Sequence, residues 1–302
     1  MINTISTIQK RERTFGIILV IPTLLFVIIF AIYPILYSFY LSFQRIILGL
    51  PGLGQNFIGI QNYVDLLHDK VAILSIFNTL IFVFVSTFFE IILGLLIALV
   101  IHQKFTGRGT IRAAVLVPWA IPTVVASQMW RFLFNDKYGL INFAFFGNDI
   151  ANYKAWLANP FYAFCAIIFA DVWKTSSFAA LLILAGLQTI PDELYEAAKI
   201  DGAGKWQRFS KITLPLVKPA LLIALLFRTM DAFRVFDLVF VMTQGGPADS
   251  TNVIQFYGYK KIFAEGFMGY GSTISVFIFL ITLTIAIFYI KALGSRLMEG
   301  KT

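Results

Sequence analysis

Two long stretches of the sequence, Thr14–Gln44 and Gly266–Ile290, contain no charged residue. An α-helix needs roughly 20 predominantly apolar residues to cross a bilayer, so each stretch is long enough to do so. The chain of 302 residues is 59% hydrophobic and 13% charged, whereas a soluble domain carries about 25% charged residues. Its mean hydropathy is +0.81, and the alternation of apolar and polar residues typical of barrel strands is absent. The sequence therefore predicts an all-α membrane protein.

Six segments of the chain have the length and composition of membrane-spanning helices. They cover about residues 15–40, 74–100, 112–134, 160–187, 217–243 and 270–291. We expect each span to be a single helix. The first is expected to be retained, because its apolar run is too long for the hydrophobic region of a signal peptide and it lacks a small-x-small cleavage pattern. The loops are too short for a soluble domain of typical size, so residues 1–302 are expected to form one transmembrane domain.

The distribution of Lys and Arg orients these spans. With six crossings, both termini and the loops at 101–112 and 188–218 share one side, which carries 14 Lys and Arg residues. The loops of the opposite side, at about 41–73, 135–159 and 244–269, carry six. Lys and Arg accumulate on the cytoplasmic side, so both termini are expected in the cytoplasm of a multi-pass protein of the cell membrane. The net charge of +8 is explained by this topology, and no nucleic-acid partner is expected.

Near its centre the chain contains a polar, helix-forming segment, Glu196–Pro215. A helix is expected to begin with Asp192 as its N-cap residue and to stop or bend at Gly202 and Gly204. Helical structure is expected to resume over Trp206–Ile212 before the fifth span. Composition leaves two interpretations open, a solvated loop between two spans or a docking surface for another protein.

The spacing in this segment resembles the EAA signature of ABC importer permeases. Glu196-Ala197-Ala198 is followed after three residues by Gly202, and after nine more by Ile212-x-Leu214-Pro215. In that family the corresponding loop, here about 188–216, docks into a groove of a cytoplasmic ATPase with the glycine at the bend. The resemblance thus implies ATPase coupling by Glu196, Ala197, Ala198, Asp201, Gly202, Lys205, Ile212, Leu214 and Pro215.

Three further segments resemble other parts of the same family, namely its first outer loop (Phe57-x-Gly59-x-x-Asn62-Tyr63), the opening of its second span (Asn78-Thr79-Leu80) and its third span (Pro118-Trp119-x-x-Pro122). Phe236-Asp237-Leu238 and Met242-Thr243-x-Gly245-Gly246-Pro247 look like the carbohydrate branch, the maltose-type and glycerol-phosphate-type permeases. The long basic lead into a first span that contains Pro22 and Pro34 resembles the first of the two permeases that such systems usually carry. The resemblance implies a second permease in a heterodimer, two ATPase subunits that bind ATP and Mg, and an external solute-binding protein. The chain itself has no evident phosphate-binding loop, metal-ligand cluster or catalytic triad, so it is expected to be no enzyme and to hold no cofactor.

Several charged side chains lie inside the predicted spans. Each costs at least ~2.5–3.5 kcal/mol at the bilayer centre and usually faces protein or water. Asp171 could pair with Lys174 in the fourth span, and the charges of the fifth could pair along one helix, whereas Glu90 has no partner in its own helix. These groups either lock the bundle or line a water-filled path that holds a hydroxylated solute. The candidate pathway residues are Asp171, Trp173, Lys174, Arg228, Asp231, Arg234 and Asp237.

The resemblance predicts a permease subunit that forms half of the pathway of an ATP-driven importer for a sugar or oligosaccharide. The positive charges of Arg228 and Arg234 are compatible with glycerol phosphate or another polar solute as the substrate. Neutralisation of these two charges by Asp231 and Asp237 favours a neutral oligosaccharide instead. An ion-coupled secondary carrier is an alternative suggested by the buried acids, but the chain lacks the repeated halves common in such carriers. A membrane anchor or assembly factor without a pore is the third possibility.

Overall fold

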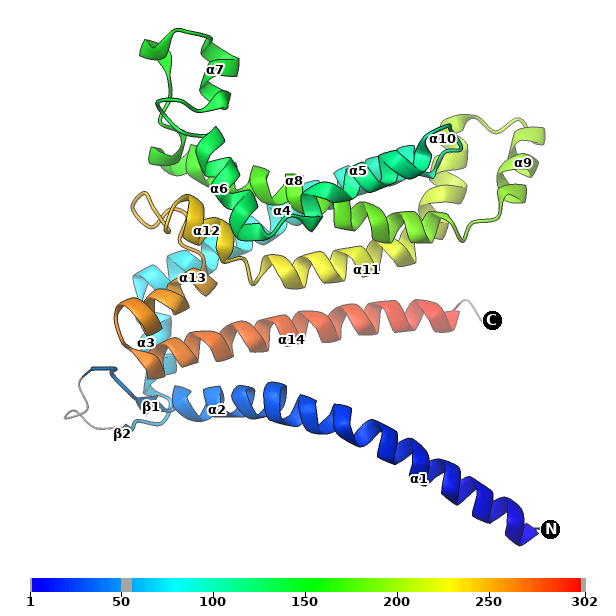
Figure 1. The fold of residues 1–302 in the computed structure, drawn as a ribbon, viewed down its shortest axis with the longest axis horizontal. Coiled ribbons are helices and arrows are strands. Elements are labelled where there is room, and N and C mark those ends of the chain that lie inside the picture. Colours follow the sequence, from blue (N-terminus) through cyan, green and yellow to red (C-terminus); the bar gives the residue numbers. More distant parts are fainter. Residues whose placement is uncertain (1, 50–55, 300–302) are drawn as a thin grey trace. The chain divides into compact units, whose positions relative to one another are not determined.

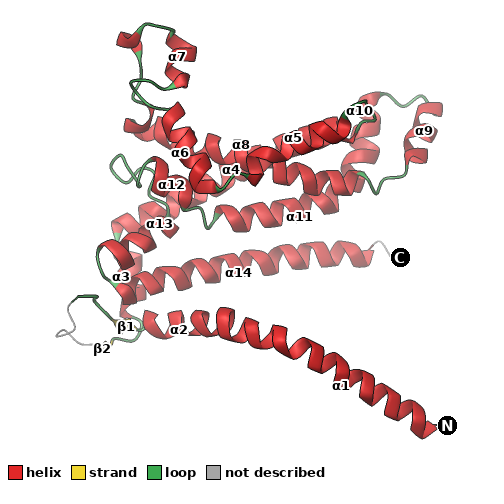
Figure 2. Ribbon diagram, viewed as in Figure 1, coloured by secondary structure: helices red, strands yellow, loops and turns green. Residues whose placement is uncertain are grey.

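The computed structural model in Figure 1 describes residues 2–49 and 56–299. The ends of the expected 1–302 domain, residue 1 and residues 300–302, lie outside these ranges. Most of the described residues are helical (Figure 2), and their strands are the short antiparallel pair β1 (Gln44–Arg45) and β2 (Asn56–Phe57). The predicted all-α class is confirmed.

Five helical segments of the described residues are long and apolar enough to cross a membrane, and a bent pair of helices would make a sixth. The five are Thr14–Ser42, Lys70–His102, Pro160–Leu187, Lys205–Ala232 and Met268–Lys291. They contain or coincide with the first, second, fourth and sixth predicted spans and overlap the fifth. The prediction of about six membrane helices is therefore confirmed.

The third predicted span, about 112–134, is not a single helix. α5 (Arg108–Ala120) and α6 (Thr123–Leu133) meet at a bend of 87°. Pro122 explains the break, because a proline disfavours helical geometry at the preceding residue, and Ile121 has a ψ of 131°. The expectation of one helix per span is wrong here. As a result, the last carbonyls of α5 need partners from outside that helix.

The fifth predicted span, about 217–243, is displaced towards the N-terminus. A continuous helical segment runs over Lys205–Ala232 and consists of α10 (Lys205–Arg208), the π-helical turn η5 (Phe209–Thr213) and α11 (Leu214–Ala232). The chain then leaves helical geometry before α12 (Asp237–Met242) begins. The expected ladder of four charges on one helix is therefore wrong, because Arg234 and Asp237 lie beyond the end of α11.

The chain divides into two compact units, the first comprising Met1–Leu67 and Gly258–Phe277. Its elements are α1 (Ile2–Val27), the π-helical turn η1 (Ile28–Ile32), α2 (Tyr33–Ser42), α3 (Gln61–His68) and the π-helical turn η6 (Lys260–Ala264), with the start of α14 (Met268–Glu299). Asn62, which is buried, donates hydrogen bonds to the carbonyls of Ser42 and Gln44 at 2.8 and 2.9 Å. This residue of the predicted outer-loop motif therefore fixes the start of α3 to the end of α2.

The second unit comprises His68–Tyr257 and Ile278–Thr302. Its centre is formed by α4 (Lys70–His102) and α8 (Pro160–Leu187), which pack against each other and against α11 (Figure 1). Asp69 caps α4 by accepting hydrogen bonds from two backbone N–H groups, and Asn159 caps α8 in the same way. The other elements are α7 (Leu140–Phe146), the 3₁₀ turns η3 (Ile150–Asn152) and η4 (Trp156–Ala158), α9 (Asp192–Ile200) and α13 (Ile254–Tyr259).

Two of the π-helical turns stand at the same position relative to a proline. In η1 the N–H of Tyr33 donates to the carbonyl of Ile28, and in η5 the N–H of Leu214 donates to that of Phe209. The next residues are Pro34 and Pro215, which have no N–H to continue the helical pattern. The wider turn keeps the helix continuous across each proline, so Pro215 does not separate α10 from α11.

Candidate functional site

Small residues bring α4, α8 and α11 close together in the second unit. A Cβ added at Gly94 of α4 would lie 2.8 Å from the Cβ of Ala179 in α8, and one added at Gly186 of α8 would overlap the Cβ of Ala220 in α11. Such close contacts between helices require small side chains. The backbones of the three helices are therefore held near enough for short side chains on them to meet.

Arg228 of α11 is the centre of an ionic cluster that joins these three helices. Its Nε and Nη2 donate to the carboxylate of Glu90 in α4 at 2.5 and 3.1 Å. Nη2 also donates to Asp171 of α8 at 3.4 Å, and Nη1 to Asp231 of α11 at 2.5 Å. The side chains of Arg228 and Glu90 are 3% and 0% exposed, whereas that of Asp231 is 61% exposed. One guanidinium thus neutralises charges from three helices, and the partner that Glu90 lacks in its own helix comes from α11.

The predicted ion pair between Asp171 and Lys174 is absent from the described residues. Asp171 pairs with Arg228 instead, and Nζ of Lys174 donates to the carbonyl of Trp119 at 3.1 Å. Trp119 lies at the C-terminal end of α5, where the bend leaves carbonyls without helical partners. A cation is favourable at this negative end of a helix, so Lys174 stabilises the broken third span.

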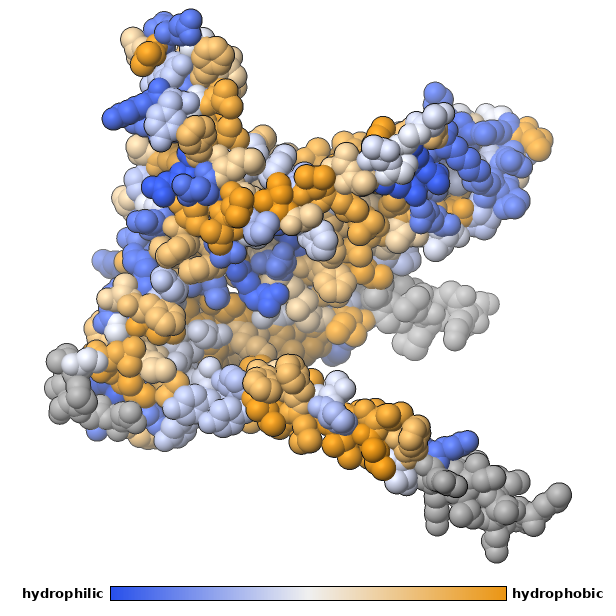
Figure 3. Space-filling model, in the orientation of Figure 1, coloured by the Kyte–Doolittle hydropathy of each residue, from blue (hydrophilic) through white to orange (hydrophobic). Residues whose placement is uncertain are grey.

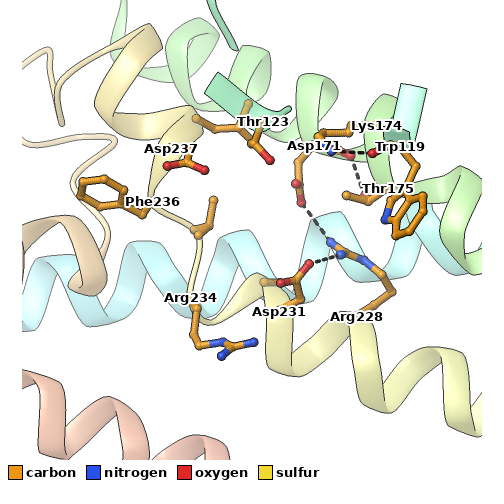
Figure 4. A pocket seen from close by; sticks show the side chains of 13 residues that line it. Trp119, Thr123, Asp171, Lys174, Thr175, Arg228, Asp231, Arg234, Phe236 and Asp237 are labelled. Carbon is orange, nitrogen blue, oxygen red and sulfur yellow. Dashed lines mark hydrogen bonds and ion pairs between the residues drawn. The ribbon is translucent and has the colours of Figure 1, made fainter. Parts of the chain in front are cut away.

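A cavity of about 230 Å³ lies between these helices (Figure 4). Its charged lining residues are three bases and three acids: Lys174, Arg228, Arg234, Asp171, Asp231 and Asp237. The sequence predicted all six as pathway candidates, and the structure brings them to one cavity. Uncharged lining residues include Trp119, Thr123, Thr175 and Phe236. These four were not predicted as site residues. Pro122 could have indicated the helix break that brings Trp119 and Thr123 to the cavity wall.

Arg234 and Asp237 do not form the ion pair that their spacing suggested. Within the described part of the chain, neither residue takes part in an ion pair. In Figure 4 the guanidinium of Arg234 points away from Asp237. Both side chains are therefore charges of the cavity wall with room for another partner.

Trp173, the predicted aromatic platform, does not line this cavity. Its ring packs edge-on against Trp130 of α6, with centroids 5.4 Å apart. The aromatic ring at the cavity is Trp119, which stacks on Phe178 of α8 at 5.4 Å between centroids. An aromatic face beside polar groups is therefore present, but it is supplied by α5 and not by α8.

The polar segment predicted to couple to an ATPase forms a second candidate site, at the opposite end of α11. α9 ends at Ile200, Gly202 adopts a φ of +78°, and helical structure resumes at Lys205. This is the predicted helix, turn and helix. Figure 3 shows that the end of the unit with α9 and α10 is largely hydrophilic beside the apolar surface of the neighbouring helices.

The segment has an inner face and an outer face. On the inner side the hydroxyl of Tyr195 lies 3.0 Å from that of Thr213, and Tyr195 and Ile212 pack against the buried core of α4, α8 and α11. On the outer side Ile200 is 87% exposed and Trp206 74% exposed. The predicted coupling residues Glu196, Ala197, Asp201, Gly202, Lys205, Leu214 and Pro215 are exposed, and Ala198 and Ile212 are half-buried.

Asp192 is not the N-cap residue of α9, as the sequence suggested. It is the first helical residue, and Pro191 occupies the cap position. The Asp192 carboxylate pairs with Nζ of Lys104 at 2.7 Å, and both side chains are exposed. This hydrogen bond lowers the pKa of Asp192 and raises that of Lys104. Both groups therefore stay charged across the neutral range, and the pair connects the loop before α5 to the start of α9.

Comparisons with known proteins show the family to which the chain belongs. Residues 90–299 match the family described as "Binding-protein-dependent transport system inner membrane component". The chain is 43% identical to the trehalose/maltose transport system permease of Thermococcus litoralis, covering 96% of this chain and 97% of that one. It is 39% identical to the trehalose transport system permease of Mycobacterium tuberculosis (97% and 93% covered). It is 35% identical to the sulfoquinovosyl glycerol permease of Agrobacterium fabrum (94% and 92% covered).

The fold also matches a solved structure. A chain of a bacterial ABC transporter involved in import of the acidic polysaccharide alginate superimposes with a TM-score of 0.80 at 24% identity, covering 95% of this chain and 96% of that one. The chain described here belongs to the family of inner-membrane components of binding-protein-dependent transport systems. The resemblance to importer permeases is thereby confirmed. The chain is a permease subunit and not itself an enzyme.

Proposed function

We propose that this chain is one of two permease subunits of an ATP-driven sugar importer and forms half of its translocation pathway. The family membership supports a permease, and the names of the most similar relatives reported above support a sugar as its solute. The cavity beside Arg228 is the proposed solute pathway. The turn around Gly202 is the proposed contact with a separate ATPase.

The observation that carries this proposal is the continuity of one helix between the two sites. Lys205, directly after the exposed turn, and Arg228, in the cavity wall, belong to the same helical segment. At 1.5 Å per residue they are roughly 35 Å apart along it. A rigid helix of this length would move the cavity wall whenever a partner displaces the turn.

Two apolar side chains mark the turn as a contact surface. Ile200 and Trp206 lie on either side of Gly202 and are strongly exposed in an otherwise polar segment. Large exposed apolar groups of this kind are typical of protein interfaces. Two ATPase subunits that bind ATP and Mg would occupy this position, one beneath each permease. Their closure on ATP would push α9 and α10 and change the access of the cavity from one side of the membrane to the other.

The cavity has the side chains that a sugar requires. The carboxylates of Asp231 and Asp237 can accept hydrogen bonds from hydroxyl groups, and Trp119 offers an aromatic ring. Polar groups that converge on a pocket fix a ligand's orientation. A solute-binding protein on the outer side would deliver the sugar. The excess of Lys and Arg near the Gly202 turn supports a cytoplasmic position for that turn and for both termini, in the cell membrane.

The first experiment is a mild-detergent purification from native membranes through a C-terminal tag, followed by identification of the chains that copurify. We expect an ATPase and a second permease of similar topology. The complex is then reconstituted in liposomes, where uptake of radiolabelled trehalose should require ATP and the external binding protein. A chain that purifies alone and transports on an ion gradient without ATP would overturn the proposal and favour a secondary carrier. If neither energy source drives uptake of any solute, an anchor without a pore is favoured.

A further inference from the structure

Arg228 lines the cavity, but the protein itself occupies nearly all of its hydrogen-bonding capacity. A guanidinium has five N–H donors, and four hydrogen bonds run from Arg228 to Glu90, Asp171 and Asp231. At most one N–H remains for a solute. Arg228 is therefore poorly suited to bind a phosphate or carboxylate group in the two-point manner that arginine uses for anions.

Glu90 changes the charge of the cavity without lining it. The cavity wall has three basic and three acidic side chains, and Glu90 lies behind Arg228 as a fourth carboxylate. Its side chain is fully buried, so water does not screen it as it screens a surface charge. The cluster formed by Arg228, Glu90, Asp171 and Asp231 is thus one guanidinium among three carboxylates.

The two other cations of the wall, Lys174 and Arg234, form no ion pair with this cluster within the described residues. Lys174 donates one of its N–H groups to the Trp119 carbonyl, and Arg234 is an exposed side chain whose guanidinium points away from Asp237 in Figure 4. By contrast, Asp231 presents its carboxylate to the cavity, and its Oδ1 takes no hydrogen bond within the described residues. The wall beside Arg228 therefore offers acceptors for hydroxyl donors, and it leaves an anion no two-point contact with Arg228.

We propose that Glu90 is a specificity-determining residue that acts through Arg228, so that the cavity accepts neutral, hydroxyl-rich sugars and rejects anionic ones. This inference rests on the proposed function as a sugar permease and adds to it the charge class of the solute. Glu90 is a positioning residue, because it does not reach the cavity itself. If Glu90 carried no charge, the guanidinium of Arg228 would be available to hold an anionic group of a solute.

The test measures binding to the permease complex directly, so that the selectivity of an external binding protein plays no part. The complex is placed in nanodiscs of phosphatidylcholine, and equilibrium dialysis gives Kd for radiolabelled trehalose and trehalose 6-phosphate. The wild-type complex should bind trehalose at least tenfold more tightly. In Glu90→Gln this preference should fall by at least tenfold, through a gain in phosphate-sugar affinity that weakens with added salt. Trehalose affinity should change less than threefold.

A merely structural role of Glu90 predicts a different result. Glu90→Gln would then weaken the binding of both sugars equally, and this outcome overturns the inference. Equal affinity of the wild-type complex for the two sugars also overturns it. Asp149→Asn removes a carboxylate from an exposed loop position and should leave the ratio of the two affinities unchanged.

A second variant covers the case in which Glu90→Gln does not fold. Asp231→Asn leaves the buried Glu90–Arg228 pair intact and removes the exposed carboxylate that accepts a hydrogen bond from Nη1 of Arg228. It should shift the preference towards trehalose 6-phosphate by about threefold or more, and no shift would overturn the inference. If ATP drives uptake of trehalose although the wild-type complex prefers the phosphate sugar, the function stands and the inference fails. If neither sugar binds and ATP drives no uptake, both fail.

Discussion

Glu90 and Arg228 are 138 residues apart in the sequence and form a two-point ion pair at 2.5 and 3.1 Å, with both side chains almost fully buried. The pair joins α4 to α11, and Asp171 of α8 completes the connection. Attraction within a buried pair is offset by the cost of removing both charges from water. The second unit should therefore lose more stability when one residue of the pair is replaced than when both are replaced.

The first prediction concerns this dependence. Arg228→Met should leave the Glu90 carboxylate buried without its partner and destabilise the protein by about 3–5 kcal/mol. The double variant Glu90→Gln/Arg228→Met should be more stable than Arg228→Met alone, because it no longer buries the Glu90 carboxylate, although Asp171 still lacks the guanidinium. Thermal unfolding of the detergent-solubilised protein, followed by fluorescence-detected gel filtration, measures both.

The matched control for this prediction is the exposed ion pair of Lys104 and Asp192. Lys104→Met should leave the unfolding temperature unchanged, because solvent screens exposed pairs. Equal unfolding temperatures for Lys104→Met and Arg228→Met would contradict the structural role of the buried cluster.

The second prediction concerns the contact between α4 and α8. A Cβ at Gly94 would lie 2.8 Å from the Cβ of Ala179 and 3.0 Å from the backbone N of Ala180. Gly94→Ala should therefore force the helices apart and destabilise the protein by about 1–3 kcal/mol. Ala179→Gly should rescue it only in part, because the contact with the backbone of Ala180 remains.

Gly109 of α5 provides the comparison for Gly94. A Cβ there would meet nothing within 4 Å, and alanine is the better helix former. Gly109→Ala should therefore be neutral or slightly stabilising in the same unfolding assay. A loss of stability as large as that of Gly94→Ala would contradict the assignment of the Gly94 effect to the close approach of α4 and α8.

Local patterns predicted much of this fold. Uncharged apolar runs located the spans, because a bilayer imposes a minimum length on them. The helix, turn and helix around Gly202 followed from residues that favour helix ends and from a glycine that adopts a positive φ. The break at Ile121–Pro122 could have been predicted as well, since a proline restricts the residue before it, but the two residues lie within one apolar run.

The charged residues of the cavity could be predicted from the sequence, but the ion pairs that they form could not. Any charge inside a predicted span had to face protein or water, which identified Asp171, Arg228 and Asp231. No local pattern shows that Glu90 meets Arg228, because that contact depends on how α4 and α11 pack. Nor does a glycine or proline mark the end of α11 at Ala232, and this led to the wrong expectation that Arg234 and Asp237 continue the same helix.

The third prediction concerns the proposed coupling turn. A Cβ at Gly202 would meet nothing within 4 Å, and φ is +78°, a conformation that aspartate and asparagine tolerate better than most residues. Gly202→Asp should therefore leave the protein inserted and folded but abolish ATP-driven uptake, because a charge would stand at the proposed ATPase contact. Gel filtration measures whether the variant is folded, and uptake by reconstituted liposomes measures the loss of transport.

Two comparisons separate the docking effect from strain. Gly202→Asn adopts the same backbone geometry without a charge and should retain more uptake than Gly202→Asp. Ile200→Ser removes an exposed apolar group from the same surface and should weaken copurification of the ATPase. Normal uptake by Gly202→Asp with the ATPase still bound would be incompatible with the proposed contact.

The last prediction concerns Arg234 and Asp237, which form no ion pair within the described residues although both line the cavity. In a double-variant cycle of Arg234→Ala and Asp237→Ala, the changes in unfolding free energy should add to within about 0.5 kcal/mol, as for groups that do not interact. The corresponding cycle for Glu90 and Arg228 should instead show strong coupling. Trehalose uptake should fall in Asp237→Ala while its unfolding temperature stays near that of the wild type, because the carboxylate faces the cavity and not a partner side chain. Strong coupling between Arg234 and Asp237 would mean that the two charges pair in the folded protein, and the cavity would then lose two of the groups proposed to contact the sugar.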